Sequence, residues 1–195
     1  MSRSALLSCV AILVVGCGGR VVPLPHAIPA KAQLDLSALS HVWVAGFVTS
    51  GGRQIDLNAE TVRLIRRDLR VWSPARVVDA EPLFLSDEER LHDVPYWRRL
   101  GEEHGSPLIV TGTVKLLLAP PAVVQRGRRT LVLPTGRVLD ATVVLIDGET
   151  GEVRSACKLR GRMRYAEGMV SSDTALFFQL MDEAKGDWLG AIGAC

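Results

Sequence analysis

The hydrophobic and polar positions divide most of the chain into strand-like and helix-like segments. Continuous β-branched or apolar runs predict buried strands over 41–48 and 107–118 and a shorter strand over 75–80. Apolar residues at helical spacing predict helices over 58–72, 94–105 and 172–192. In the first helix, Asn58 is expected to cap the N-terminus, and the charged residues Arg63, Arg66, Arg67 and Asp68 are expected to lie towards solvent.

The last two strand-like segments, 137–148 and 152–165, follow each other across a short turn. Segment 152–165 alternates with a period of two, which places apolar and basic positions on opposite faces of a strand. The basic positions, called the ladder below, are Arg154, Lys158, Arg160, Arg162 and Arg164. We expect either a docking face for an anionic partner, extended by Arg126, Arg128 and Arg129 in the preceding loop, or an edge strand that carries charge against aggregation.

The order of these elements predicts the fold class. An α/β (α+β) domain over residues 38–195 is indicated by the order of elements, which is a strand, a helix, a strand, further helices, three long strands and a last helix. The early alternation of strand and helix favours parallel pairing, and the later strands favour an antiparallel meander. We therefore expect one mixed sheet with helices packed on it.

The N-terminus carries a short apolar stretch from Ala5 to Gly16 behind Arg3. It is shorter than the roughly 20 residues of a spanning helix and has the basic start and apolar centre of a secretory signal. Its end, Val14-Val15-Gly16-Cys17, resembles the lipobox of bacterial lipoproteins. The resemblance implies cleavage between Gly16 and Cys17 and lipid on Cys17. There are two alternatives: an ordinary signal peptide that is followed by a cysteine by chance, or an N-terminal helix buried in the domain.

The segment that follows, 17–37, is Pro-rich and is expected to act as a tether between the lipid and the domain. In Gram-negative lipoproteins, a residue other than Asp after the lipidated cysteine, here Gly18, implies export to the outer membrane. The implied location is that membrane, with the domain facing the periplasm.

The chemistry-bearing residues form no recognised catalytic or metal-binding motif. The chain has no H-E-x-x-H, C-x-x-C or G-x-S-x-G pattern, so no catalytic residue, metal site or cofactor is predicted. Glu102, Glu103 and His104 could supply a general base, although a solvated helix end is the commoner explanation. Cys157 and Cys195 would remain after processing and could form a disulfide.

The formal charge argues against a general nucleic-acid binder. It is +2 for the full chain and +1 after loss of Arg3 with the signal.

Three segments together resemble one group of bacterial envelope lipoproteins. They are Val44–Phe47, Leu100–Val114 with the pattern L-G-x-x-H-G before a buried strand, and Val143–Val153 with D-G-x-T-G. The group includes the curli-secretion channel lipoprotein, the penicillin-binding-protein activator lipoproteins and domains like the N-terminal part of the Tol-Pal translocation protein. The resemblance covers residues 40–190 and implies the same α/β fold.

A secretion pore is disfavoured, because segment 119–137 holds Pro120, Pro121, Pro134 and several arginines where lipid-facing hairpins would be needed. The sequence favours a non-enzymatic, lipid-anchored component that docks on or assembles an envelope complex. The alternative is a cell-wall or envelope enzyme with a dispersed site.

Overall fold

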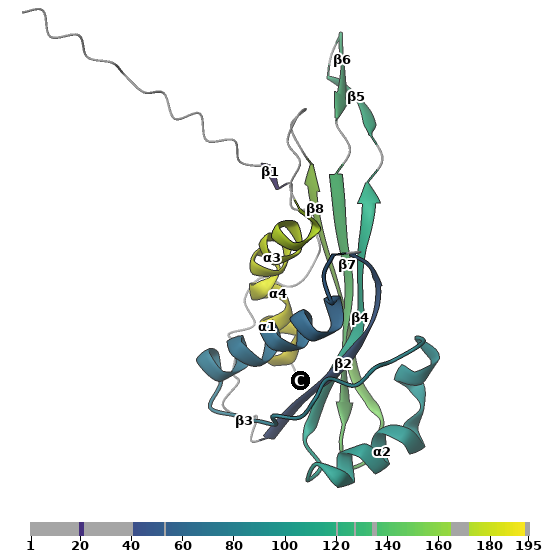
Figure 1. The fold of residues 1–195 in the computed structure, drawn as a ribbon, viewed down its shortest axis with the longest axis vertical. Helices are drawn as coiled ribbons and strands as arrows, with labels where there is room; N and C mark the ends of the chain where they lie inside the picture. The colour runs from purple at the N-terminus through teal and green to yellow at the C-terminus, as the bar shows by residue number, and fades with distance from the viewer. Residues whose placement is uncertain are drawn as a thin grey trace, which may run out of the picture.

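One mixed β-sheet forms the centre of the molecule (Figure 1). The computed structural model describes residues 20–21, 41–52, 54–119, 121–126, 128–133, 136–164 and 172–193. The sheet has the strand order β1-β8-β7-β4-β2-β3. Its strands are β1 (Arg20–Val21), β2 (His41–Gly51), β3 (Arg76–Val77), β4 (Leu108–Ala119), β7 (Gly136–Asp147) and β8 (Val153–Arg164).

The strand directions confirm the α/β fold class and the mixed sheet predicted from the sequence. β2 pairs in parallel with β3 and β4, whereas β4, β7 and β8 form an antiparallel meander. β3 contains only two residues, because the remainder of the segment predicted as a strand over 75–80 leaves the sheet after Val77.

Helices cover both faces of the sheet (Figure 1). α1 (Leu57–Trp72), α3 (Asp173–Glu183) and α4 (Lys185–Gly193) pack on one face, where Leu69, Phe177 and Trp188 join the larger core cluster. The 3-10 helix η2 (Glu89–His92) and α2 (Val94–Glu103) cover part of the other face, where Trp43, Ile109 and Trp97 form a second core. None of the helices in the described part of the chain has the length and apolarity needed to cross a bilayer.

Two expectations about α1 are wrong, and the reason is the edge of β2. Asp56 caps the helix by accepting a hydrogen bond from the Ala59 N–H, whereas the Asn58 side chain accepts from the Phe47 N–H at 2.8 Å. Arg66 is buried, and its Nη2 donates to the Val44 carbonyl at 2.7 Å, beside the bulge between Val44 and Gly46. Both side chains satisfy backbone groups on the edge of β2 that faces away from β4, so neither is free to cap or to lie in solvent.

Segment 119–137 is not a loop but contains a two-stranded hairpin. β5 (Ala122–Arg126) pairs antiparallel with β6 (Arg129–Leu133), and the hairpin projects beyond the ends of β4 and β7 (Figure 1). The strands begin and end between the prolines, so these residues bound the hairpin instead of interrupting it.

The predicted tether contains two residues that pair with the sheet. Arg20 and Val21 form β1 and pair with Arg164 and Met163 at the end of β8. Residues 22–37 lie outside the described part of the chain.

Candidate functional site

The residues predicted to carry the lipid anchor, Gly16 and Cys17, lie outside the described residues, so lipidation stays a prediction. Cys195 also lies outside them, and the disulfide with Cys157 stays a prediction as well. Cys157 is half-buried on the helix-covered face of β8, where desolvation, with a contribution from the Asp187 carboxylate, raises the pKa of its thiol.

The alternation predicted for β8 is present in the middle of the strand. Ala156, Lys158 and Arg160 are exposed, whereas Cys157 is partly buried and Leu159 is buried against the helices. Arg162 and Arg164 occupy the same alternate positions along the backbone.

Arg154 lies at the bulge between β7 and β8 and binds a carboxylate of its own turn. Its Nε and Nη2 both donate to Asp147 Oδ2. Burial opposes ionisation of Asp147, but hydrogen bonds from Arg154 and from the Thr150 and Glu149 N–H groups outweigh it, so the pKa of Asp147 lies below its ordinary value. This member of the ladder is therefore already partnered.

A polar groove of about 400 Å³ lies on the face of the sheet that η2 and α2 leave open. Its basic side chains are Lys115 on β4 and Lys158 and Arg160 on β8, and its acidic side chains are Asp140 on β7 and Glu88. Lys115 Nζ lies 2.5 Å from Glu88 Oε1, and this carboxylate raises the pKa of Lys115. Arg160 Nε lies 3.9 Å from Asp140 Oδ2, a loose contact between two exposed groups.

Lys158 is the cation of this groove for which the described residues supply no carboxylate within ion-pair distance. The groove contains three cations and two carboxylates, so it keeps one unit of positive charge available to an anionic group.

The eight basic residues predicted to form one docking face fall into two separate groups. Arg126, Arg128 and Arg129 surround the turn of the β5–β6 hairpin, and the structure does not bring them beside the ladder. Gly136 pairs with Arg164 at the end of β8, and the hairpin, whose five-residue strands each span about 14 Å, projects beyond this end (Figure 1).

The position of β8 bears on the alternative explanation of the ladder. Among the described strands, β1 alone pairs with the outer edge of β8, at Met163 and Arg164. Val153–Arg162 is therefore an edge, where charged side chains oppose unwanted strand pairing. Edge protection remains a sufficient explanation for Arg154, whereas Lys158 and Arg160 also line the groove.

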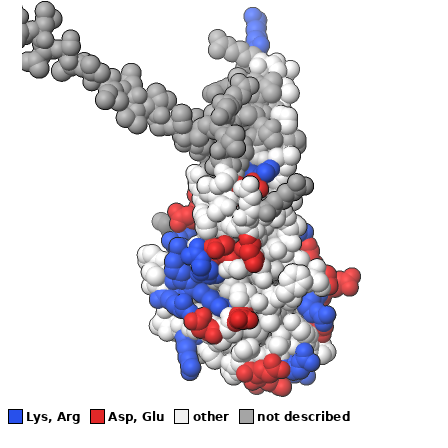
Figure 2. Space-filling model, in the orientation of Figure 1, with Lys and Arg blue, Asp and Glu red and all other residues white. Residues whose placement is uncertain are grey.

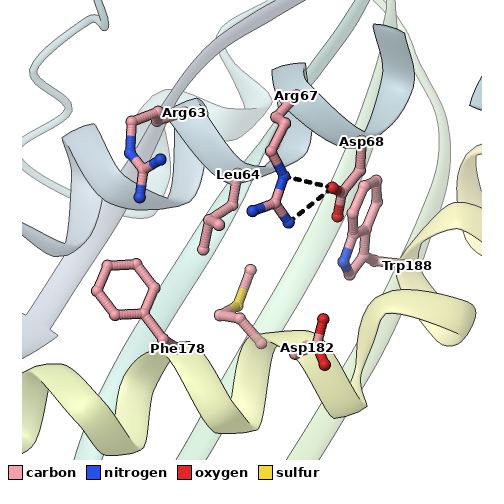
Figure 3. A pocket seen from close by; sticks show the side chains of 8 residues that line it. Arg63, Leu64, Arg67, Asp68, Phe178, Asp182 and Trp188 are labelled. Atoms are coloured by element: carbon pink, nitrogen blue, oxygen red, sulfur yellow. Dashed lines mark hydrogen bonds and ion pairs between the residues drawn. The ribbon is translucent and has the colours of Figure 1, made fainter. Parts of the chain in front are cut away.

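A second pocket, between α1 and the pair α3–α4, was missed by the sequence reasoning (Figure 3). Its volume is about 380 Å³, and Figure 3 shows Arg63 from α1 above Phe178 from α3, with Arg67 beside Asp68. The Asp68 carboxylate, expected in solvent, is buried, and its Oδ1 lies 2.7 Å from both Nε and Nη2 of Arg67. Arg63 stacks over Phe178 at 5.7 Å.

The basic side chains of α1 form a visible patch beside acidic ones (Figure 2). Because Arg63 pairs with Glu60 and Arg67 with Asp68, the patch is largely neutralised from within α1. The hydrogen bond to Asp68 is the main cause of the raised pKa of Arg67. Across the described residues, no three potential ligands gather to hold a metal ion.

Two of the motifs that carry the family resemblance pack against each other, one in α2 and the other in the β7–β8 turn. The Gly101 Cα, in α2, lies so close to the β7–β8 turn that a Cβ there would stand 1.8 Å from the Gly148 carbonyl oxygen. Arg98 Nε donates to the Thr150 carbonyl at 3.1 Å, and the Gly148 N–H donates to the Pro107 carbonyl at 3.0 Å.

The histidine of the first motif is also structural. The ring centroid of His104 lies 4.1 Å from that of Trp43. These contacts assign L-G-x-x-H-G and D-G-x-T-G to packing between α2 and the sheet.

No protein-family model matches the chain, and no curated protein matches it. The solved structures that are similar to this chain include that of lipoprotein GNA1162 from Neisseria meningitidis. Its TM-score is 0.45 and its sequence identity is 11%, over 76% of this chain and 96% of that one. They also include a variant PelC dodecamer from Paraburkholderia phytofirmans, with a TM-score of 0.42 and 16% identity over 84% of this chain and 96% of that one.

A third similar structure is a neuraminyllactose-binding hemagglutinin homolog from Helicobacter pylori. Its TM-score is 0.41 and its identity 12%, over 85% of this chain and 90% of that one. One of these three proteins is thus a bacterial lipoprotein, but at such TM-scores the likeness assigns no function. The resemblance to the curli-secretion and penicillin-binding-protein activator group stays a prediction from the sequence.

Proposed function

We propose that this chain is a lipid-anchored envelope protein that acts without catalysis, as a docking or accessory component of a larger complex. The observation that carries this proposal is Val14-Val15-Gly16-Cys17 behind Arg3 and a short apolar stretch. Its domain would face the periplasm at the outer membrane, held there by acyl chains on Cys17. Each buried methylene contributes about 0.8 kcal/mol to membrane binding, so several chains would make release very slow.

The polar groove of β4, β7 and β8 is the docking surface that we propose for an anionic partner. Lys158 supports this proposal because it is exposed and no described carboxylate neutralises it. A carboxylate-bearing protein or cell-envelope polymer would supply the missing charge. An enzymatic role has less support, because the sequence holds no recognised catalytic motif and the buried carboxylate of the pocket beside α1, Asp68, is bound to Arg67.

The anchor is tested by Cys17→Ala in a strain that processes lipoproteins. We expect wild-type protein in the membrane fraction with acyl groups detected by mass spectrometry, and the variant without acyl groups and uncleaved before residue 17. Export is controlled by Cys9→Ala in the predicted signal, which leaves both the lipobox and the predicted Cys157–Cys195 bridge intact. Wild-type protein without acyl groups would refute the lipoprotein assignment.

The docking surface is tested by the double variant Lys158→Ser/Arg160→Ser. At low salt, we expect recovery of a specific partner from detergent-solubilised envelope to fall about 2- to 30-fold, because exposed ion pairs contribute about 0.2–1 kcal/mol each. The matched control is Arg76→Ser/Arg99→Ser, which removes the same charge from exposed positions on β3 and α2. Equal losses in the two variants would show that net charge, not the groove, determines binding.

A further inference from the structure

The pairing of β1 places the predicted anchor at one end of the sheet. Arg20 pairs with Arg164, Arg164 pairs with Gly136, and Gly136 pairs with Ala119, so these four residues form one row across the sheet. Three residues of chain separate Arg20 from Cys17, which limits their Cα–Cα distance to about 11 Å. A lipid on Cys17 would therefore attach close to this row.

The β5–β6 hairpin leaves the sheet from the same row. It lies between Ala119 and Gly136 in the chain, and its five-residue strands alone span about 14 Å in the direction that leads away from the sheet (Figure 1). The hairpin thus reaches beyond the farthest point that Cys17 can occupy along the strand direction. When the end of the sheet that bears the anchor faces the bilayer, the turn of the hairpin meets the lipid surface.

The composition of the hairpin and its base fits such a surface. Leu117 and Leu118, at the base of this arm on β4, are 40% and 63% exposed, and Val123 on β5 is 67% exposed. The other described side chains from Pro121 to Thr130 are also exposed. The turn is flanked by Arg126, Arg128 and Arg129, and Figure 2 shows a basic side chain at the tip.

We propose that the β5–β6 hairpin binds the anionic surface of the membrane that holds the lipid anchor. This inference rests on the lipid-anchored function proposed above. The arginines at the turn would lie among anionic headgroups, and Val123 would follow them on β5, three residues or about 10 Å behind Arg126. The hairpin would then fix the orientation of the domain, and the β8 groove would extend away from the membrane towards a periplasmic partner.

The arginines supply a measurable part of this contact. A basic residue at an anionic membrane surface is expected to favour the bound state about fivefold, and salt screens the effect. Three of them would favour the docked orientation by up to about 100-fold on anionic vesicles at low salt.

The experiment uses the full lipidated protein reconstituted into vesicles of phosphatidylcholine with phosphatidylglycerol, or of phosphatidylcholine alone. Cys157→Ala and Cys195→Ala leave no other free thiol, and a fluorescent probe is attached through Val123→Cys. A control probe is attached through Glu149→Cys, in the exposed β7–β8 turn at the opposite end of the sheet. Nitroxide-labelled lipids report proximity to the bilayer by quenching.

We expect strong quenching of the probe at 123 on anionic vesicles, weaker quenching on neutral vesicles, and little at 149 on either. Arg126→Ser/Arg128→Ser/Arg129→Ser should reduce the quenching at 123, whereas Arg70→Ser/Arg76→Ser/Arg99→Ser should not. Circular dichroism and thermal unfolding verify that each variant is folded.

Failure of the two proposals can be told apart. Protein without acyl groups by mass spectrometry refutes the lipid-anchored function. Acylated protein with equal quenching at 123 and 149 refutes the hairpin contact alone. Quenching at 123 that is indifferent to lipid charge and to the arginines refutes the role of anionic lipid. If the fluorescence of the probe at 123 shows that it is shielded from water but nitroxide-labelled lipids do not quench it, the hairpin associates with another copy of the protein, and this result also overturns the proposal.

Discussion

Gly101→Ala should destabilise the domain, because Gly101 lies where α2 packs against the β7–β8 turn. In a helix without close neighbours, replacing Gly by Ala stabilises by up to about 1 kcal/mol, because Ala has the higher helix propensity. At Gly101, the new methyl group would stand 1.8 Å from the Gly148 carbonyl oxygen, 2.5 Å from its carbonyl carbon and 2.7 Å from its Cα. All three are backbone atoms, so no side-chain rotation relieves the overlap.

The magnitude follows from the required displacement. Contacts below 3.0 Å are essentially never observed for Cβ atoms, so α2 and the turn would have to separate by more than 1 Å. Overpacking of this kind costs about 1–3 kcal/mol and sometimes more, which exceeds the gain in helix propensity. We expect a net loss of about 1–2 kcal/mol, or about 2–8 °C in Tm for a domain of this size.

The assay is thermal or urea unfolding followed by circular dichroism, with Gly190→Ala in α4 as the matched control. Apart from α4's own backbone and the neighbouring residues in the chain, no described atom lies within 4 Å of the Cβ position at Gly190, so this variant should be neutral or more stable. Stabilisation of both variants to a similar degree would refute the close approach of Gly101 to Gly148.

Three further predictions concern individual residues. Arg66→Met should destabilise the domain by about 1–3 kcal/mol in urea unfolding, because it leaves the Val44 carbonyl without its donor; an unchanged midpoint would contradict this. Because the pKa of Asp147 is lowered in the fold, ionised Asp147 should stabilise the protein at pH values above its unfolded pKa, near 3.9, and this stabilisation should be lost as the pH falls through the folded pKa. Asp147→Asn should flatten that part of the curve of unfolding free energy against pH, and an unaltered curve would contradict the prediction. Non-reducing digestion of exported protein should yield one peptide pair joined through Cys157 and Cys195; two free thiols would exclude the bridge.

The long strands were predictable because their sequences combine continuous apolar runs with clear ends. The predicted strands 107–118 and 137–148 differ by one residue at each end from Leu108–Ala119 and Gly136–Asp147. The alternation in 152–165 also gave the correct inner and outer faces in the middle of β8, since a strand places successive side chains on opposite faces.

The errors arose where a polar side chain serves the backbone of a distant segment or a neighbouring charge. Asn58, Arg66 and Asp68 have the composition of a solvated helix face, yet each is held by an interaction that helical periodicity does not encode. The prolines around β5 and β6 indicated a loop, because composition alone does not show whether a proline lies inside a strand or at its boundary.

The two candidate pockets combine residues that are far apart in the chain. The groove brings β4, β7 and β8 together, and the other pocket joins α1 to α3 and α4. Their lining depends on strand order and helix packing, which the sequence pattern left open. The ladder could be found from the alternation of Lys and Arg, but the separation of the hairpin arginines from it could not.

The contacts of α1 with β2 also have a consequence for the order of folding. Arg66 and Asn58 lie 22 and 11 residues from the backbone groups that they bind, whereas Thr111, on the partner strand β4, lies 65 residues from Gly46. As the chain is synthesised from its N-terminus, β2 and α1 can associate before β4 is available. Because Asn58 and Arg66 then bind backbone groups at one edge of β2, the other edge is the one left open for the arriving β4. Two polar side chains of a helix would thus help to select the strand order of the whole sheet.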